Sequence, residues 1–103
     1  MKFAANREYA LEPVIEEKLR EPSLFRFVLH NDDYTPMEFV VKVLEQFFYM
    51  DRRTAINIMM EVHTRGKAAF GLFTQDVVET KISQVAEQAK LHEHPLNCSA
   101  EAA

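Results

Sequence analysis

The chain has 103 residues, enough for one small domain, and 48% of them are hydrophobic, including eight Phe and five Met. A core of this kind needs no disulfide or metal, and the single cysteine, Cys98, excludes an intramolecular disulfide. The net charge of −4 argues against nucleic acid as a partner, because phosphate binding needs a basic surface. With no apolar run near the roughly 20 residues of a membrane span and no secretory signal, we expect a protein of the reducing cytoplasm.

Residues 1–23 differ in composition from the rest of the chain. The stretch from Asn6 to Pro22 holds five glutamates, three basic residues and two prolines, and its apolar residues are sparse. Such a segment buries too little apolar surface to offset the conformational entropy lost on ordering. We therefore predict a flexible N-terminal extension over residues 1–23 and one folded domain over residues 24–103.

The folded domain is predicted to begin with a strand from Leu24 to Leu29. This stretch is rich in aromatic and branched residues, and Phe25, Phe27 and Leu29 share one face at a period of two. Polar residues that bond their own backbone favour turns, so the run over residues 31–35 ends the strand.

A first helix is predicted from Pro36 to Tyr49, with Thr35 as its N-cap and Glu38 completing a capping box. Its apolar residues recur at spacings of three and four, which describe one helical face: Met37, Val40, Val41, Leu44, Phe47 and Phe48. A second helix is predicted to start at the N-cap Asp51 and to end at Gly66, which can adopt the left-handed conformation. Its apolar residues lie on more than one side, as expected of a helix that contacts both a core and a ligand.

The remaining elements are a strand over residues 67–73, a third helix and a short last strand over residues 96–98. Thr74 is predicted to cap the third helix, with Asp76 in its first turn, where a negative charge meets the positive end of the helix dipole. Three helices and three short strands indicate an α+β fold, a two-layer sandwich with the helices on one face of a small antiparallel sheet.

The polar run Asn31-Asp32-Asp33 has two interpretations. Asn and Asp are common turn residues, so the run could simply reverse the chain. Alternatively, Asn31 and Asp32 present oxygen acceptors to a cationic ligand such as an ammonium group. His63, at the end of the second helix, is either a structural residue or a third acceptor through a neutral ring nitrogen.

Sequence motifs of enzymes and metal sites are missing. The chain has two glycines and no glycine-rich phosphate loop, no serine in a nucleophile elbow, and no Cys pair or HExxH pattern. The spacing His92-x-His94 is only a weak metal signal. We therefore expect a binding module without a catalytic role, without a cofactor and without a metal.

Several blocks of the sequence resemble one known family. The run from Asn31 to Val40 is similar to the opening signature of the ClpS family, the adaptors of the ATP-dependent Clp protease. Further blocks agree with that family in order and spacing: Met59, Val62 and His63, Gly66-Lys67, Gly71-x-Phe73-Thr74, Glu79-Thr80-Lys81 and His94-Pro95-Leu96. The resemblance covers residues 24–98.

The resemblance implies a function and a set of site residues. ClpS proteins bind the free α-amino group and the large apolar or aromatic side chain (Leu, Phe, Tyr or Trp) of an N-degron, and deliver the substrate to the ClpA unfoldase of the ClpAP protease. Asn31, Asp32 and His63 match the positions that bind the α-amino group. The positions of the side-chain pocket and its rim are matched by Leu29, Asp33, Thr35, Met37, Val40, Met59, Val62 and Leu96. Asp76 and Lys81 match positions that dock on the unfoldase, and the N-terminal extension matches a segment needed for delivery. The chain is expected to be a monomer.

Two other functions stay open at this stage. A generic interaction domain of the same fold would bind an internal peptide segment and would not depend on a free amino end. A small metal-assisted hydrolase would use Asp32, His63 and the pair His92 and His94, and would contain bound metal.

Overall fold

The structure is a computed structural model that describes residues 23–103, so the extension predicted for residues 1–23 lies outside the described residues except for Ser23. The elements follow in this order: β1 (Phe25–His30), α2 (Met37–Phe48), α3 (Arg52–Arg65), β2 (Lys67–Phe73), α4 (Gln75–Leu91) and β3 (Asn97–Ala102). In the described part of the chain, no helix is long and apolar enough to cross a membrane.

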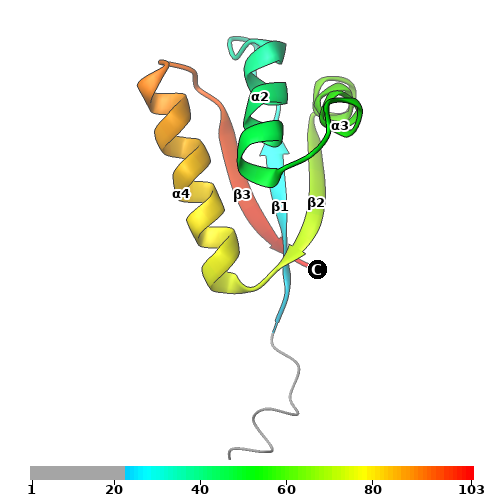
Figure 1. The fold of residues 1–103 in the computed structure, drawn as a ribbon, viewed down its shortest axis with the longest axis vertical. Coiled ribbons are helices and arrows are strands. Elements are labelled where there is room, and N and C mark those ends of the chain that lie inside the picture. Colours follow the sequence, from blue (N-terminus) through cyan, green and yellow to red (C-terminus); the bar gives the residue numbers. More distant parts are fainter. Residues whose placement is uncertain (1–22) are drawn as a thin grey trace, which may run out of the picture.

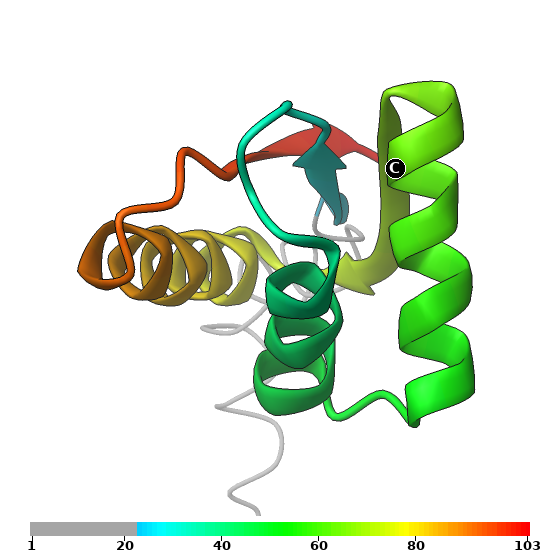
Figure 2. The ribbon, with the colours of Figure 1, turned by 90° about the horizontal axis from the view of Figure 1, so that it is seen from above.

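One layer of the domain is an antiparallel sheet with the strand order β2-β1-β3, so β1 is central. The helices lie on one side of this sheet, with α4 along β3 and β1 and α3 beside β2 (Figures 1 and 2). This arrangement confirms the predicted α+β sandwich of three helices on a three-stranded antiparallel sheet.

The face of β1 that was expected to be apolar forms the centre of the core. Phe27 and Leu29 are fully buried, and the Phe27 ring packs 4.7 Å from the Phe48 ring and 5.4 Å from the Phe70 ring, measured between centroids. Burying a side chain of this size contributes roughly 1.5–3 kcal/mol. The core therefore joins β1 to the end of α2 and to β2.

Three of the four predicted caps are found at the expected residues, Asp51, Gly66 and Thr74, although the Thr74 side chain makes no capping hydrogen bond; the fourth is wrong. The Asp51 side chain accepts a hydrogen bond from the Thr54 amide at 2.9 Å, and Gly66 ends α3 with a φ of 90°. Thr35 does not cap α2. The N-cap is Pro36, and the Thr35 hydroxyl donates instead to the Asp32 carboxylate three residues earlier. A capping box needs the Thr35 oxygen to accept from an amide of the first helical turn, and here the bond to Asp32 holds that side chain toward the preceding loop.

The last strand is longer than predicted. β3 extends to Ala102, whereas the apolar pattern indicated only residues 96–98. Residues 99–102 (Ser-Ala-Glu-Ala) include types with weak strand preference, but each pairs with a residue of β1 over residues 25–28. The edge of the central strand, rather than local propensity, sets the length of β3.

Replacing Gly71 by Ala is expected to destabilise the domain by about 2–4 kcal/mol. Gly71 has a φ of 78°, a conformation that costs other residues about 1–2 kcal/mol, and a Cβ built there would overlap the Phe73 ring. Gly66→Ala is the matched control, because its φ is 90° but a Cβ there meets nothing within 4 Å. Urea unfolding should show the larger loss for Gly71→Ala, and equal losses would contradict the role of the Phe73 contact.

Candidate functional site

A cavity of about 190 Å³ lies between the β1–α2 loop, the start of α2 and the C-terminal half of α3. Its lining combines an apolar wall with a polar rim: Asn31, Asp32, Asp33, Thr35, Met37, Val40, Met59, Val62 and His63. An apolar cavity of about 150 Å³ is large enough to bind benzene, so this one has room for one large side chain.

A single backbone contact brings the two halves of the rim together. The Asn31 amide, just beyond β1, donates to the Gly66 carbonyl at the end of α3, at 2.8 Å. His63 stands one turn before Gly66 on the same helix, so the contact places its ring on the side of the β1–α2 loop. Val40 and Val62 are both buried and form the apolar floor.

The Asp32 carboxylate is held by three donors. Its Oδ1 accepts from the amides of Tyr34 at 2.8 Å and Thr35 at 2.7 Å, and its Oδ2 accepts from the Thr35 hydroxyl at 2.8 Å. Partial burial raises the pKa of Asp32, but the bonds from Tyr34 and Thr35, together with the nearby His94, lower the pKa below its usual value. A carboxylate has about four lone-pair directions, so Oδ2 keeps one for a ligand.

Asn31 and His63 are exposed, and within residues 23–103 their side chains make no hydrogen bond. An amide oxygen and a neutral imidazole nitrogen are both acceptors. None of the lining residues is Lys or Arg. The rim therefore offers a carboxylate and further acceptors with no competing cation, an arrangement that favours a cationic donor such as an ammonium group.

Every residue that lines the cavity is among the site residues named from the sequence. The structure does not place Leu29 or Leu96 in the lining. Leu29 is fully buried in the core, and Leu96 lines a separate surface hollow with Tyr34 and His94. Leu29 faces the helices as a core residue of β1, which sequence alone does not distinguish from a pocket wall.

The two residues expected at the unfoldase-docking surface lie on α4, away from the cavity. Asp76 is exposed in the first turn of α4. Lys81 is half-buried, and its Nζ donates to the Phe47 carbonyl at 2.6 Å.

Over the described residues, no group of three or more His, Cys, Asp or Glu side chains is arranged to hold a metal ion. The rings of His92 and His94 pack instead against Phe39, with centroids 5.6 and 4.5 Å away. Burial raises the pKa of the Cys98 thiol to about 11, so this side chain stays protonated and unreactive near neutral pH.

Comparison with known families agrees with this geometry. Residues 20–99 match the family model of the ATP-dependent Clp protease adaptor protein ClpS. The chain belongs to the ClpS family. It is therefore a non-catalytic adaptor of the Clp protease and not an enzyme.

Relatives share this sequence over most of their length. The chain is 50% identical over 90 residues to the ClpS adapter of Alkalilimnicola ehrlichii, covering 84% of this chain and 85% of the relative. It is 48% identical over 93 residues to ClpS 1 of Agrobacterium fabrum, covering 90% and 80% of the two chains. A solved structure of Agrobacterium tumefaciens ClpS2, bound to L-phenylalaninamide, matches with a TM-score of 0.78 and 36% identity, over 81% of this chain and all of that one.

Proposed function

We propose that this ClpS-family adaptor captures proteins by a free α-amino group together with a large first side chain (Leu, Phe, Tyr or Trp), and delivers them to the ClpA unfoldase of the ClpAP protease. The observation that carries the proposal is the position of the cation-free acceptor rim directly over an apolar cavity sized for one side chain. The adaptor acts as a monomer in the cytoplasm.

In this proposal the polar rim of the cavity binds the free amino end of the substrate. An ammonium group is strongly hydrated, and stripping its water is costly unless new acceptors replace it. Asp32 offers the remaining lone pair of Oδ2, and Asn31 and His63 offer one acceptor each. Acetylation would remove the positive charge and add bulk at the rim, so a blocked amino end should bind poorly.

The cavity itself accommodates the side chain of the first residue of the substrate. Full burial of a Leu or Phe side chain contributes roughly 1.5–3 kcal/mol. Val40, Met59 and Val62 supply the apolar wall, and Asp33 and Thr35 complete the rim. Leu29 is fully buried in the same core cluster as Val40 and Val62. The ligand of the Agrobacterium tumefaciens structure is a phenylalanine derivative, which supports a pocket of this type.

The proposal is tested by fluorescence anisotropy of labelled peptides that begin with Leu, Phe, Val or acetylated Leu. Tight binding of the Leu and Phe peptides, with weak binding of the other two, is the expected result. Equal binding of all four would instead favour an internal-peptide-binding domain of the same fold. No binding to any of them would leave the family assignment intact but refute the proposed ligand.

Replacing Met37 by Ala is expected to admit peptides that begin with Val or Ile, strengthening their binding by about tenfold. Met37 is 45% exposed and lines the cavity. In this proposal its side chain crowds a ligand that is branched at Cβ. Tenfold corresponds to about 1.4 kcal/mol, the scale of a single removed clash. Leu-headed peptides measured by the same anisotropy assay are the control, and unchanged relative affinities for Val, Ile and Leu would refute the role of Met37.

A further inference from the structure

A groove of about 300 Å³ lies between α2 and the C-terminal part of α4. It is distinct from the cavity that is proposed to bind the amino end of a substrate, called the amino-binding cavity below. The amino-binding cavity takes Met37 and Val40 from α2, whereas the groove takes Phe39 and Val43 from another face of the same helix. The described linings of the two sites have no residue in common, so the proposed capture of a first residue does not account for the groove.

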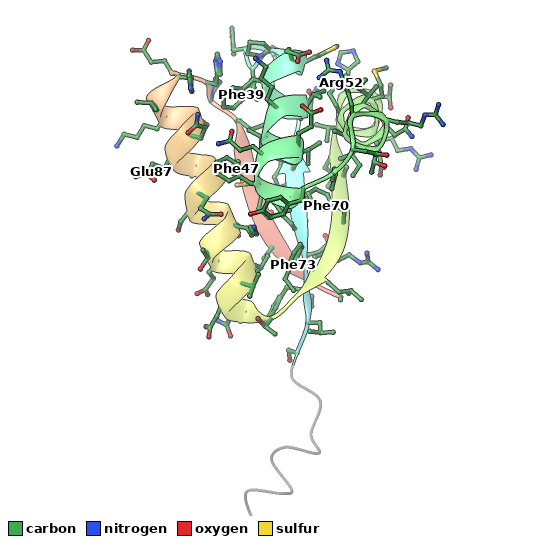
Figure 3. The ribbon with its side chains drawn as sticks, viewed as in Figure 1. Phe39, Phe47, Arg52, Phe70, Phe73 and Glu87 are labelled. Atoms are coloured by element: carbon green, nitrogen blue, oxygen red, sulfur yellow. The ribbon has the colours of Figure 1, made fainter. Side chains whose placement is uncertain are left out.

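The floor of the groove is apolar and held in place. Val43 is fully buried, and Phe39 is half-buried on the side of α2 that faces α4 (Figure 3). The Phe39 ring packs edge-on against the rings of His92 and His94, with centroids 5.6 and 4.5 Å away, and these contacts fix its plane. A fixed aromatic ring beside an aliphatic side chain suits a flat apolar group, such as an aromatic ring of a ligand.

Lys42 provides the one unpaired charge of the groove lining that the structure describes. This lining holds a single carboxylate, that of Glu38, and the Arg52 guanidinium binds both of its oxygens, at 2.9 and 3.1 Å. Within residues 23–103, Lys42 makes no ion pair and no hydrogen bond. The groove is therefore complementary to an anion, even though the net charge of the whole chain is −4.

Gln88 orients His92 as a second donor. Its Nε2 lies 3.0 Å from His92 Nε2. An amide nitrogen donates and does not accept, so His92 Nε2 is the acceptor of this bond, and a neutral ring then carries its proton on Nδ1. In the described part of the chain, His92 Nδ1 has no hydrogen-bond partner. The groove thus combines an apolar floor with a cation and an N–H donor, the usual composition of a small-ligand site.

We propose that this groove is a second binding site, for a small molecule that carries a carboxylate on an aromatic body. The ring lies against Phe39 and Val43, and the carboxylate binds Lys42. One cation over one apolar floor matches a ligand with one charged and one apolar group, whereas a stable protein partner covers about 800 Å² of surface. The amino-binding cavity has the opposite chemistry, with acceptors and no Lys or Arg in its lining. The proposal rests on the groove alone and does not depend on the proposed capture.

The probe for this site is N-acetyl-L-phenylalanine, which carries an aromatic ring and a carboxylate but no ammonium group for the amino-binding cavity. Titration of the isotope-labelled full chain, followed by NMR, should give saturable shifts of the Gln46 and Gln88 side-chain amides and of the Val43 backbone amide. N-acetyl-L-phenylalaninamide, which lacks the carboxylate, should bind about fivefold more weakly. Equal affinities, shifts confined to Asn31 and His63, or no saturable shift would each overturn the inference.

Lys42→Met and Lys90→Met form a matched pair of variants. Methionine keeps the apolar stem of Lys42 and removes its charge, so Lys42→Met should bind N-acetyl-L-phenylalanine about fivefold more weakly and the amide probe unchanged. Lys90 is exposed near the end of α4 and does not line the groove. Lys90→Met changes the net charge equally and should bind like the wild type. Equal losses in the two variants would show only long-range attraction and would overturn the site. Melting temperatures verify that both variants fold.

The two sites are tested separately. Saturating N-acetyl-L-phenylalanine should leave the affinity for a Leu-headed peptide unchanged, because no described residue lines both sites. Competitive displacement of that peptide would place the probe in the amino-binding cavity and overturn the inference. A chain that binds the probe in the groove but no Leu-headed peptide refutes the proposed function alone. A chain that binds the peptide but not the probe refutes this inference alone.

Discussion

Replacing Asp32 by Ala is expected to weaken the binding of a Leu-headed peptide by about 100-fold or more. The change removes a charge-assisted hydrogen bond to the ligand ammonium, worth roughly 1.5–3 kcal/mol. It also removes the acceptor for the amides of Tyr34 and Thr35 and for the Thr35 hydroxyl, so the loop that forms the rim loses its internal support. The two effects add, and 100-fold corresponds to about 2.7 kcal/mol.

Asp33→Ala is the matched control for this experiment. Asp33 is the next residue, lines the same cavity and carries the same formal charge, but within the described residues its side chain makes no hydrogen bond. Both variants should be compared by peptide anisotropy and by melting temperature. A loss for Asp33→Ala as large as that for Asp32→Ala would mean that the rim acts only through its total negative charge.

The lowered pKa of Asp32 fixes the direction of its pH dependence. Burial alone raises that pKa, and the bonds from Tyr34 and Thr35 outweigh it. The stability that these bonds contribute is therefore fully present above the ordinary pKa of an unfolded Asp, near 3.9, and is lost as the pH falls through the lower folded value. Asp32 accordingly stays ionised, and available to an ammonium group, throughout the mildly acidic range.

The elements of the fold could be predicted because their apolar periodicity is strong. Spacing alone predicts the face of β1 that carries Phe27 and Leu29, and capping chemistry alone predicts the start of α3 at Asp51. The end of β3 could not be predicted in this way, because pairing with the neighbouring strand determines it. The bond from Thr35 to Asp32 could not be predicted either, since the direction of the Thr35 side chain depends on how the loop folds in three dimensions.

The residues that line the cavity could be named as a site from the sequence only through the resemblance to the ClpS family. Local patterns left Asn31 and Asp32 as a plain turn or a ligand site, and no spacing rule links them to His63, about thirty residues later. The bond between the Asn31 amide and the Gly66 carbonyl makes that link. The groove between α2 and α4 had no sequence signal, because two helices far apart in the sequence must pack together before Phe39, Lys42 and His92 share one surface.

Removing residues 1–23 is expected to spare peptide capture and to abolish the accelerated degradation of a Leu-headed substrate. The described lining of the cavity lies entirely between residues 31 and 63, and β1 begins at Phe25, so the truncation leaves both the site and the sheet in place. The melting temperature of the truncated chain verifies that the domain still folds. Capture is measured by anisotropy, and delivery by the rate at which the ClpAP protease degrades a Leu-headed fluorescent protein.

A second variant replaces residues 1–23 by a Gly- and Ser-rich segment of equal length. It tests whether delivery depends on the residues of the extension or only on its length. Such a segment is a flexible coil that spans a similar distance. If the replacement restores degradation, the extension serves only as a tether of sufficient length. If degradation stays at the level of the truncated chain, the residues of the extension themselves engage the unfoldase, and docking at the domain would be necessary for delivery but not sufficient.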